Sequence, residues 1–119
     1  MSNRFDPHDF LEAATSLAAS SDEALLRTAV GRAYYSVFLV ARDRLGVVQE
    51  EGAHAEVRSR LTRRNNGGRI AEQLKRLYEL RTTADYNLDP QDPDYQNWSD
   101  NWQRALGWAN KLMPIVEKL

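Results

Sequence analysis

The chain contains no cysteine, little proline and glycine, and no long hydrophobic run. Without cysteine it can form neither disulfides nor thiolate metal sites, which suits a reducing compartment. The longest uncharged runs, such as residues 33–41, are far shorter than the roughly 20 apolar residues that cross a bilayer. The segment MSNRFDPHDF also lacks the apolar centre of a signal peptide. We therefore expect a soluble, cytoplasmic protein without membrane contact.

Motifs of several enzyme and metal-binding classes are also missing. The Gly67–Gly68 pair lacks the flanking pattern of a phosphate-binding loop and predicts a turn instead. No Glu-x-x-His motif is present, which excludes the ligand set of di-iron helical bundles. The two histidines, His8 and His54, stand alone in the sequence, and lone histidines are commonly exposed and inert. The sequence therefore predicts no metal and no cofactor.

The apolar residues that are present follow a helical pattern. The 119 residues, of which 42% are hydrophobic and 28% charged, suffice for a single domain with one core, spanning residues 1–119. Apolar side chains recur at helical spacing in nearly every segment, and no segment alternates in the manner of a β-strand. Within residues 20–45 the apolar stripe is broad enough for the central helix of a bundle. We predict an all-α fold, an up-down antiparallel bundle of four to five helices.

Local signals predict where these helices begin and end. Asp6 followed by Pro7 is typical of a helix start, and Ser20 with Glu23 forms the capping-box pattern of the next helix. Gly46 is the expected left-handed cap at the end of that helix. Further helices are expected at about residues 56–63, at about residues 69–86, and from a start between Pro93 and Ser99. Pro90 and Pro93 should stop the fourth helix, and Pro114 should kink or fray the last turn of the chain's final helix.

Charge is distributed unevenly along the chain, although the net charge is only −1. Residues 58–81 contain only two acidic residues, and their basic residues are Arg58, Arg60, Arg63, Arg64, Arg69, Lys75, Arg76 and Arg81. Residues 85–100 contain five aspartates and no basic residue. Such a distribution is typical of a surface that binds a polyanion, and equally of two solvated helix faces. The sequence leaves both interpretations open.

Arg81 occupies an unusual position near the end of the predicted fourth helix. It continues an inward-facing row that includes Ile70 and Leu74, where an unpaired arginine is costly. Asp85, four residues later, lies on the same face and can pair with it. Tyr86, by contrast, lies about 140° away from Arg81 on a regular helix, so the two can share one ligand only if the helix ends between them or a second subunit completes the site. We predict an Arg81 side chain on the buried side of the bundle, held by Asp85.

Two segments resemble HEPN domains, a family of small helical-bundle proteins of bacteria and archaea. RTAVGRAYYSVFLVARDRLG, residues 27–46, is similar to their long central helix. LYELRTTADYN, residues 77–87, is similar to their signature helix end, in which an arginine is followed by a short spacer and Asp-Tyr. The order and spacing agree along almost the whole chain. The resemblance implies dimers, and in active members a metal-independent ribonuclease, often a toxin restrained by a partner nucleotidyltransferase.

This chain departs from the family pattern where the catalytic histidine should follow the arginine. The corresponding positions are Tyr86, Asn87 and Leu88, and a tyrosine is a poor base near neutral pH. If cleavage survives, the candidate catalytic residues are Arg81, Tyr86 and His54. The resemblance otherwise makes Arg81, Asp85 and Tyr86 candidates for contact with RNA or another ligand. The basic residues Arg58, Arg63, Arg64 and Arg69 are expected to rim the same cleft as Arg81.

Three functions remain compatible with the sequence. The first is a homodimeric HEPN module that binds RNA, a nucleotide or a protein partner and has no nuclease activity. The second is a diverged ribonuclease toxin paired with a nucleotidyltransferase. The third is a helical interaction protein that shares only its fold with HEPN domains. The missing histidine favours the first over the second, and the position of Arg81 and Asp85 disfavours the third.

Overall fold

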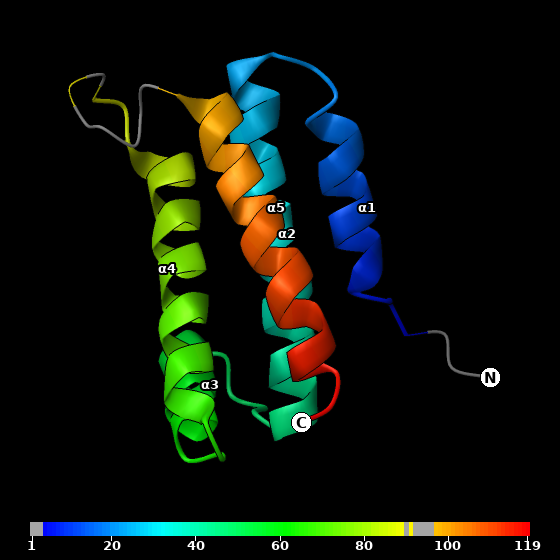
Figure 1. The fold of residues 1–119 in the computed structure, drawn as a ribbon, viewed down its shortest axis with the longest axis vertical. Helices are drawn as coiled ribbons and strands as arrows, with labels where there is room; N and C mark the ends of the chain where they lie inside the picture. The colour runs from blue at the N-terminus through cyan, green and yellow to red at the C-terminus, as the bar shows by residue number, and fades with distance from the viewer. Residues whose placement is uncertain (1–3, 90, 92–96) are drawn as a thin grey trace.

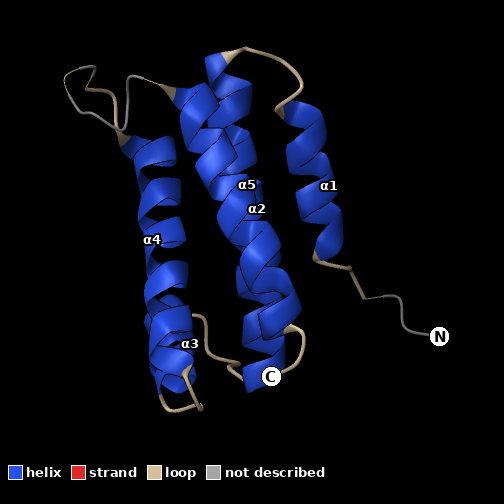
Figure 2. Ribbon diagram, viewed as in Figure 1, coloured by secondary structure: helices blue, strands red, loops and turns tan. Residues whose placement is uncertain are grey.

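The chain folds into five α-helices and, within the part described, contains no β-strand. The structure, a computed structural model, describes residues 4–89, 91 and 97–119. The helices are α1 (His8–Leu17), α2 (Glu23–Leu45), α3 (Ala53–Thr62), α4 (Gly67–Tyr86) and α5 (Trp98–Val116), as Figures 1 and 2 show. The all-helical prediction is therefore confirmed. No helix among the described residues is long and apolar enough to span a membrane.

The bundle is organised around α2. Helices α1, α4 and α5 all pack against α2, and consecutive long helices run in opposite directions (Figure 1). Short α3 lies along the first half of α4 and also touches α2. The face of α2 that lies inside the bundle is mostly apolar, and its Val30, Tyr34 and Val37 are fully buried. Leu77 of α4 and Leu112 of α5 are buried against it in the same core.

The two ends of α2 are fixed by local interactions, one of which differs from the prediction. The helix begins at Glu23, and Asp22 is its cap, because the Asp22 side chain accepts a hydrogen bond of 3.2 Å from the backbone N–H of Leu25. The predicted Ser20–Glu23 capping box is therefore wrong. Ser20 instead accepts a bond from the Asp22 N–H. Gly46 ends the helix with a φ of 70°, as predicted.

The ends of the other helices shift by a few residues from the predicted ones. Helix α3 begins at Ala53, directly after Gly52 with its φ of 68°, which is three residues earlier than expected. Helix α4 begins at Gly67. Helix α5 begins at Trp98, within the predicted interval, and continues through Pro114 to Val116, so the last turn is not frayed up to that residue.

The C-terminal end of α4 is held by an arginine from α2. The Arg27 guanidinium donates to the backbone carbonyls of Ala84 and Asn87, at 3.3 and 2.8 Å. It thereby satisfies carbonyls that a helix end leaves unpaired. Pro90 and Pro93, which were expected to stop this helix, lie outside the described residues. The contact fixes the end of α4 against α2, close to Arg81 in the sequence.

Candidate functional site

Arg81 lies on the buried face of α4, as its place in the inward row predicts. The residue is only 9% exposed, and its Nη1 donates to Asp85 Oδ2 at 3.1 Å. Its Nε is buried and has no hydrogen-bond partner among the described residues. Burial alone would lower the pKa of the Arg81 guanidinium, but the hydrogen bond to Asp85 raises that pKa. Arg81 therefore stays charged, and its buried Nε–H donor is unused.

Three tyrosine rings surround the Arg81 guanidinium. Its Cζ lies 5.2 Å from the ring centroid of Tyr78 on α4, and 5.5 and 5.9 Å from those of Tyr35 and Tyr34 on α2. Rings at this distance attract a cation through their negative faces. Tyr34 is fully buried, and burial raises the pKa of its hydroxyl, which therefore stays protonated. The rings hold the guanidinium in place while neutralising none of its charge.

His54 belongs to the same cluster, which corrects the expectation that it would be exposed. It lies in the first turn of α3, half-buried, and its Nδ1 is 2.6 Å from the Tyr34 hydroxyl. Its ring stacks on Phe38 at 4.2 Å and lies 5.0 Å from the Tyr78 ring. Desolvation lowers the His54 pKa, and the positive charges of Arg81 and Arg58 lower it further. The imidazole is therefore held in its neutral form near neutral pH.

Arg58 brings a second guanidinium to the tyrosines. It follows His54 by one helical turn on α3, and its Cζ lies 5.0 Å from the Tyr78 ring centroid. Its Nη1 is buried and, in the part of the chain that the structure describes, without a hydrogen-bond partner. We call Tyr34, Tyr35, His54, Arg58, Tyr78 and Arg81 the arginine–tyrosine cluster. It combines two guanidiniums, two unused buried donors and one adjacent carboxylate, that of Asp85, so its local charge is positive.

The remaining predicted site residues do not join this cluster. Tyr86 is 73% exposed, in keeping with its large angular separation from Arg81 on the helix. Arg63, Arg64 and Arg69 are exposed around the α3–α4 connection. Arg69 precedes Arg81 by twelve residues on α4, or about 18 Å along the helix axis. Of the four arginines expected to rim the cleft, the structure thus brings only Arg58 to Arg81.

The tyrosines are the members of the cluster that the sequence analysis did not include among the candidate site residues. Tyr34 and Tyr78 fit the apolar stripes of their helices, so the pattern assigned both to the core. The available signal was the alignment of Tyr34, Tyr78 and Arg81 on facing stripes, because three polar-tipped side chains in one region of a core need polar partners.

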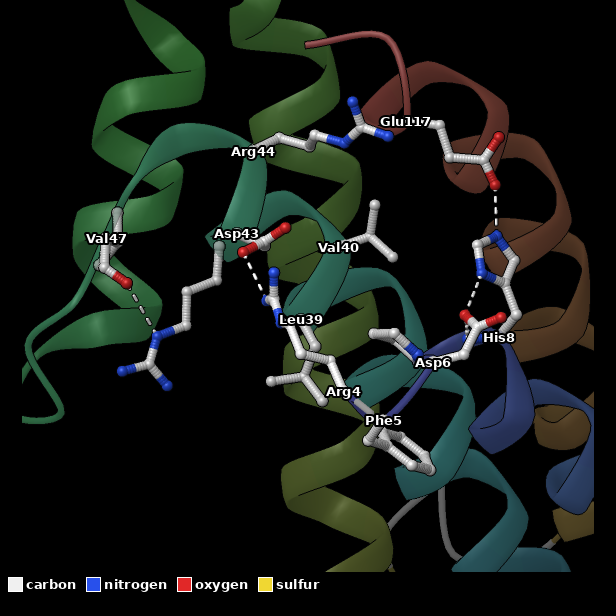
Figure 3. A pocket seen from close by; sticks show the side chains of 12 residues that line it. Arg4, Phe5, Asp6, His8, Leu39, Val40, Asp43, Arg44, Val47 and Glu117 are labelled. Atoms are coloured by element: carbon white, nitrogen blue, oxygen red, sulfur yellow. Dashed lines mark hydrogen bonds and ion pairs between the residues drawn. The ribbon is translucent and has the colours of Figure 1, made fainter. Parts of the chain in front are cut away.

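A hollow lies elsewhere, between the segment before α1, the second half of α2 and the end of α5 (Figure 3). Its volume is about 670 Å³, and its charged groups are largely paired with each other. Arg4 and Asp43 form an ion pair of 2.7 Å, and His8 lies between Asp6 and Glu117 (Figure 3). These carboxylates raise the His8 pKa, Glu117 most strongly. His8 is thus not isolated either, and these pairs fasten the start of α1 to α2 and α5.

Comparison with protein-family models, with curated proteins and with solved structures finds no match to this chain. Among the described residues, no group of histidine, aspartate and glutamate side chains is arranged to hold a metal ion. The chemistry of the arginine–tyrosine cluster must therefore be argued from its own geometry.

Proposed function

We propose that this chain is a homodimeric, HEPN-like module that binds RNA, with the arginine–tyrosine cluster holding a backbone phosphate. The observation that carries the proposal is the pair of unused buried donors, Arg81 Nε and Arg58 Nη1, on two guanidiniums that meet one tyrosine ring. A buried donor without a partner costs about 1–3 kcal/mol, and a bound phosphate oxygen would remove that cost. Guanidiniums are well suited to phosphate because their N–H groups match its oxygens in pairs.

The surroundings of the two arginines favour RNA over a bare anion. The half-buried rings of Tyr35 and Tyr78 lie beside the guanidiniums, and aromatic rings next to positive charge are typical of single-stranded nucleic-acid sites. The rings of Tyr35 and Tyr78 are half-buried, so a ligand held beside them would be only partly enclosed by one chain. A second copy facing the cluster would enclose it, which supports a dimer with one RNA strand between two chains.

Titration of labelled oligouridylate at low and moderate salt tests this function. We expect binding that weakens steeply with salt, because phosphate contacts release counterions. Arg81→Gln and Arg58→Gln should each weaken binding about tenfold and make the salt dependence shallower, since each removes one charged phosphate ligand. Arg63→Gln and Arg69→Gln, which change exposed arginines away from the cluster, are the matched controls and should change affinity by about twofold at most. One strand per two chains is expected at saturation.

Two results would contradict the proposal. The first is negligible binding at both salt concentrations. The second is equal weakening by all four substitutions, because it would place binding on the general basic surface of α3 and α4 rather than on the cluster.

A ribonuclease is the second candidate, and the position of His54 favours it. A neutral imidazole beside two guanidiniums combines a proton acceptor with phosphate ligands, although it comes from α3 and not from the helix that carries Arg81. In this interpretation a nucleotidyltransferase partner would restrain the activity. Incubation of purified protein with mixed RNA in EDTA separates the two functions. We expect intact RNA, because Nδ1 of the neutral His54 ring is engaged by the Tyr34 hydroxyl and is not free to accept a proton from the RNA. Cleavage that is lost in both Arg81→Ala and His54→Ala would establish the ribonuclease instead.

A further inference from the structure

The His54–Tyr34 pair has a fixed hydrogen-bond direction when the imidazole is neutral. The Tyr34 hydroxyl stays protonated, and among the described residues His54 Nδ1 is the one hydrogen-bond partner it has, at 2.6 Å. The hydroxyl must therefore donate to Nδ1, so the ring proton of neutral His54 is on Nε2. Nδ1 is occupied, and Nε2–H is the donor that His54 can offer to a ligand.

The charged groups that act on His54 are arginines, one of which, Arg81, is paired with Asp85. Arg42 from α2, Arg58 from α3 and Arg81 from α4 all act on the imidazole and disfavour its protonation. The rings of Tyr34, Tyr35 and Tyr78 also lie beside it, and burial raises the pKa of the Tyr34 hydroxyl, which stays protonated. A bound phosphate would bring negative charge among these guanidiniums. It would thus remove the main electrostatic obstacle to a positive imidazole.

We propose that His54 is a third ligand of the bound phosphate, positioned by Tyr34, and that it takes up a proton when the phosphate binds. This inference rests on the proposed RNA-binding function and couples that binding to the uptake of one proton. In the protonated state both ring nitrogens donate, so Nδ1–H turns to the Tyr34 oxygen, which can accept as well as donate. The pair therefore accommodates the extra proton without moving either ring, but the Tyr34 O–H then loses the acceptor it had in the neutral pair, a cost that phosphate binding must offset.

The direction of the pH effect follows from linkage. If the bound state has the higher His54 pKa, then the complex binds more protons than the free protein in the interval between the two values. The affinity for RNA should therefore rise as the pH falls through the His54 pKa of the complex. It should become constant at pH values below the His54 pKa of the free protein. The His54 pKa of the free protein lies below the ordinary value of 6.5, so the affinity should keep rising into mildly acidic solution.

Isothermal titration with oligouridylate tests the proposal, since uracil does not titrate in this range. We expect net proton uptake of up to about one per site near pH 6, measured from the heats in two phosphate-free buffers of different ionisation enthalpy. Affinity should rise about 3- to 10-fold between about pH 7.5 and about pH 5.5. His54→Gln keeps an N–H donor but cannot titrate, so it should bind more weakly than the unaltered protein at the lower pH. Its affinity should then stay flat as the pH falls. His8 is present in both proteins, and its contribution cancels in the comparison.

Tyr34→Phe is the second variant, because it tests positioning while retaining the ring. It should lower affinity several-fold and let the neutral imidazole populate both tautomers, which the ¹⁵N shifts of the His54 ring report. Proton uptake that is unchanged in His54→Gln would overturn the role of His54, even where Arg58→Gln and Arg81→Gln still weaken binding. Absence of RNA binding at every pH would overturn the proposed function and this inference together.

Discussion

Gly67→Ala should destabilise the fold by about 3 kcal/mol or more, equivalent to a fall in melting temperature of about 10 °C or more. A Cβ at position 67 would lie 1.7 Å from the carbonyl oxygen of Leu61 and 3.3 Å from Arg64 Cβ. The first of these is a backbone atom at the end of α3, so a rotamer change cannot relieve the clash. The tight connection between α3 and α4 would have to open.

Gly68→Ala is a matched control for this change. Position 68 is the next residue of the same first turn, and a Cβ there meets nothing within 4 Å. Alanine is the better helix former, so this variant should be stabilised by about 0.5–1 kcal/mol. Thermal unfolding followed by circular dichroism measures both effects. Similar melting temperatures for the two variants would show that the α3–α4 connection yields easily. It would then be a poor support for the Arg58–Arg81 geometry.

Asp85→Asn should weaken the fold and strengthen RNA binding. The substitution removes the carboxylate that pairs with Arg81 but keeps the side-chain shape. Because the Arg81 side chain is only 11% exposed, poorer pairing should cost about 1–2 kcal/mol of folding free energy. The same change leaves the cluster with more uncompensated positive charge. The affinity for oligouridylate should therefore rise about fivefold, which corresponds to roughly 1 kcal/mol of removed repulsion at a surface dielectric.

Glu72→Gln is the control for the Asp85 substitution. Glu72 pairs with Arg76 on the same helix at 3.5 Å, also four residues apart, but both side chains are more than half exposed. It should change neither stability nor affinity by more than about 0.5 kcal/mol. Denaturant unfolding and RNA titration on the same samples provide both measurements. If Asp85→Asn lowered affinity instead, then the carboxylate would be needed to aim the guanidinium, and the cluster would not bind its ligand through excess charge.

The parts of this structure that follow from local rules were predictable from the sequence. Gly46 ends α2 because a left-handed residue closes a helix there, and the pairing of Arg81 with Asp85 follows from helical periodicity alone. The sequence predicts that a polar side chain caps the start of α2, but not which residue does so. Ser20, Ser21 and Asp22 are all good caps, and only the position of the first helical turn selects Asp22.

The position of His54 could not be predicted in the same way, because it depends on the start of α3 and on contacts between three helices. A start at residue 56 leaves His54 in a loop, whereas the observed start at Ala53 puts it one turn before Arg58 on the same helix face. Gly52 permits that earlier start through its left-handed backbone. The pairing of His54 with Tyr34 then joins residues twenty positions apart on different helices, which no local pattern encodes.

All six members of the arginine–tyrosine cluster come from α2, α3 and α4, whereas α1 and α5 supply none of them. If the cluster binds RNA as proposed, then α1 and α5 take no direct part in that binding. A fluorophore, an affinity handle or a surface-immobilisation anchor joined after Leu119 should therefore leave the proposed RNA binding intact.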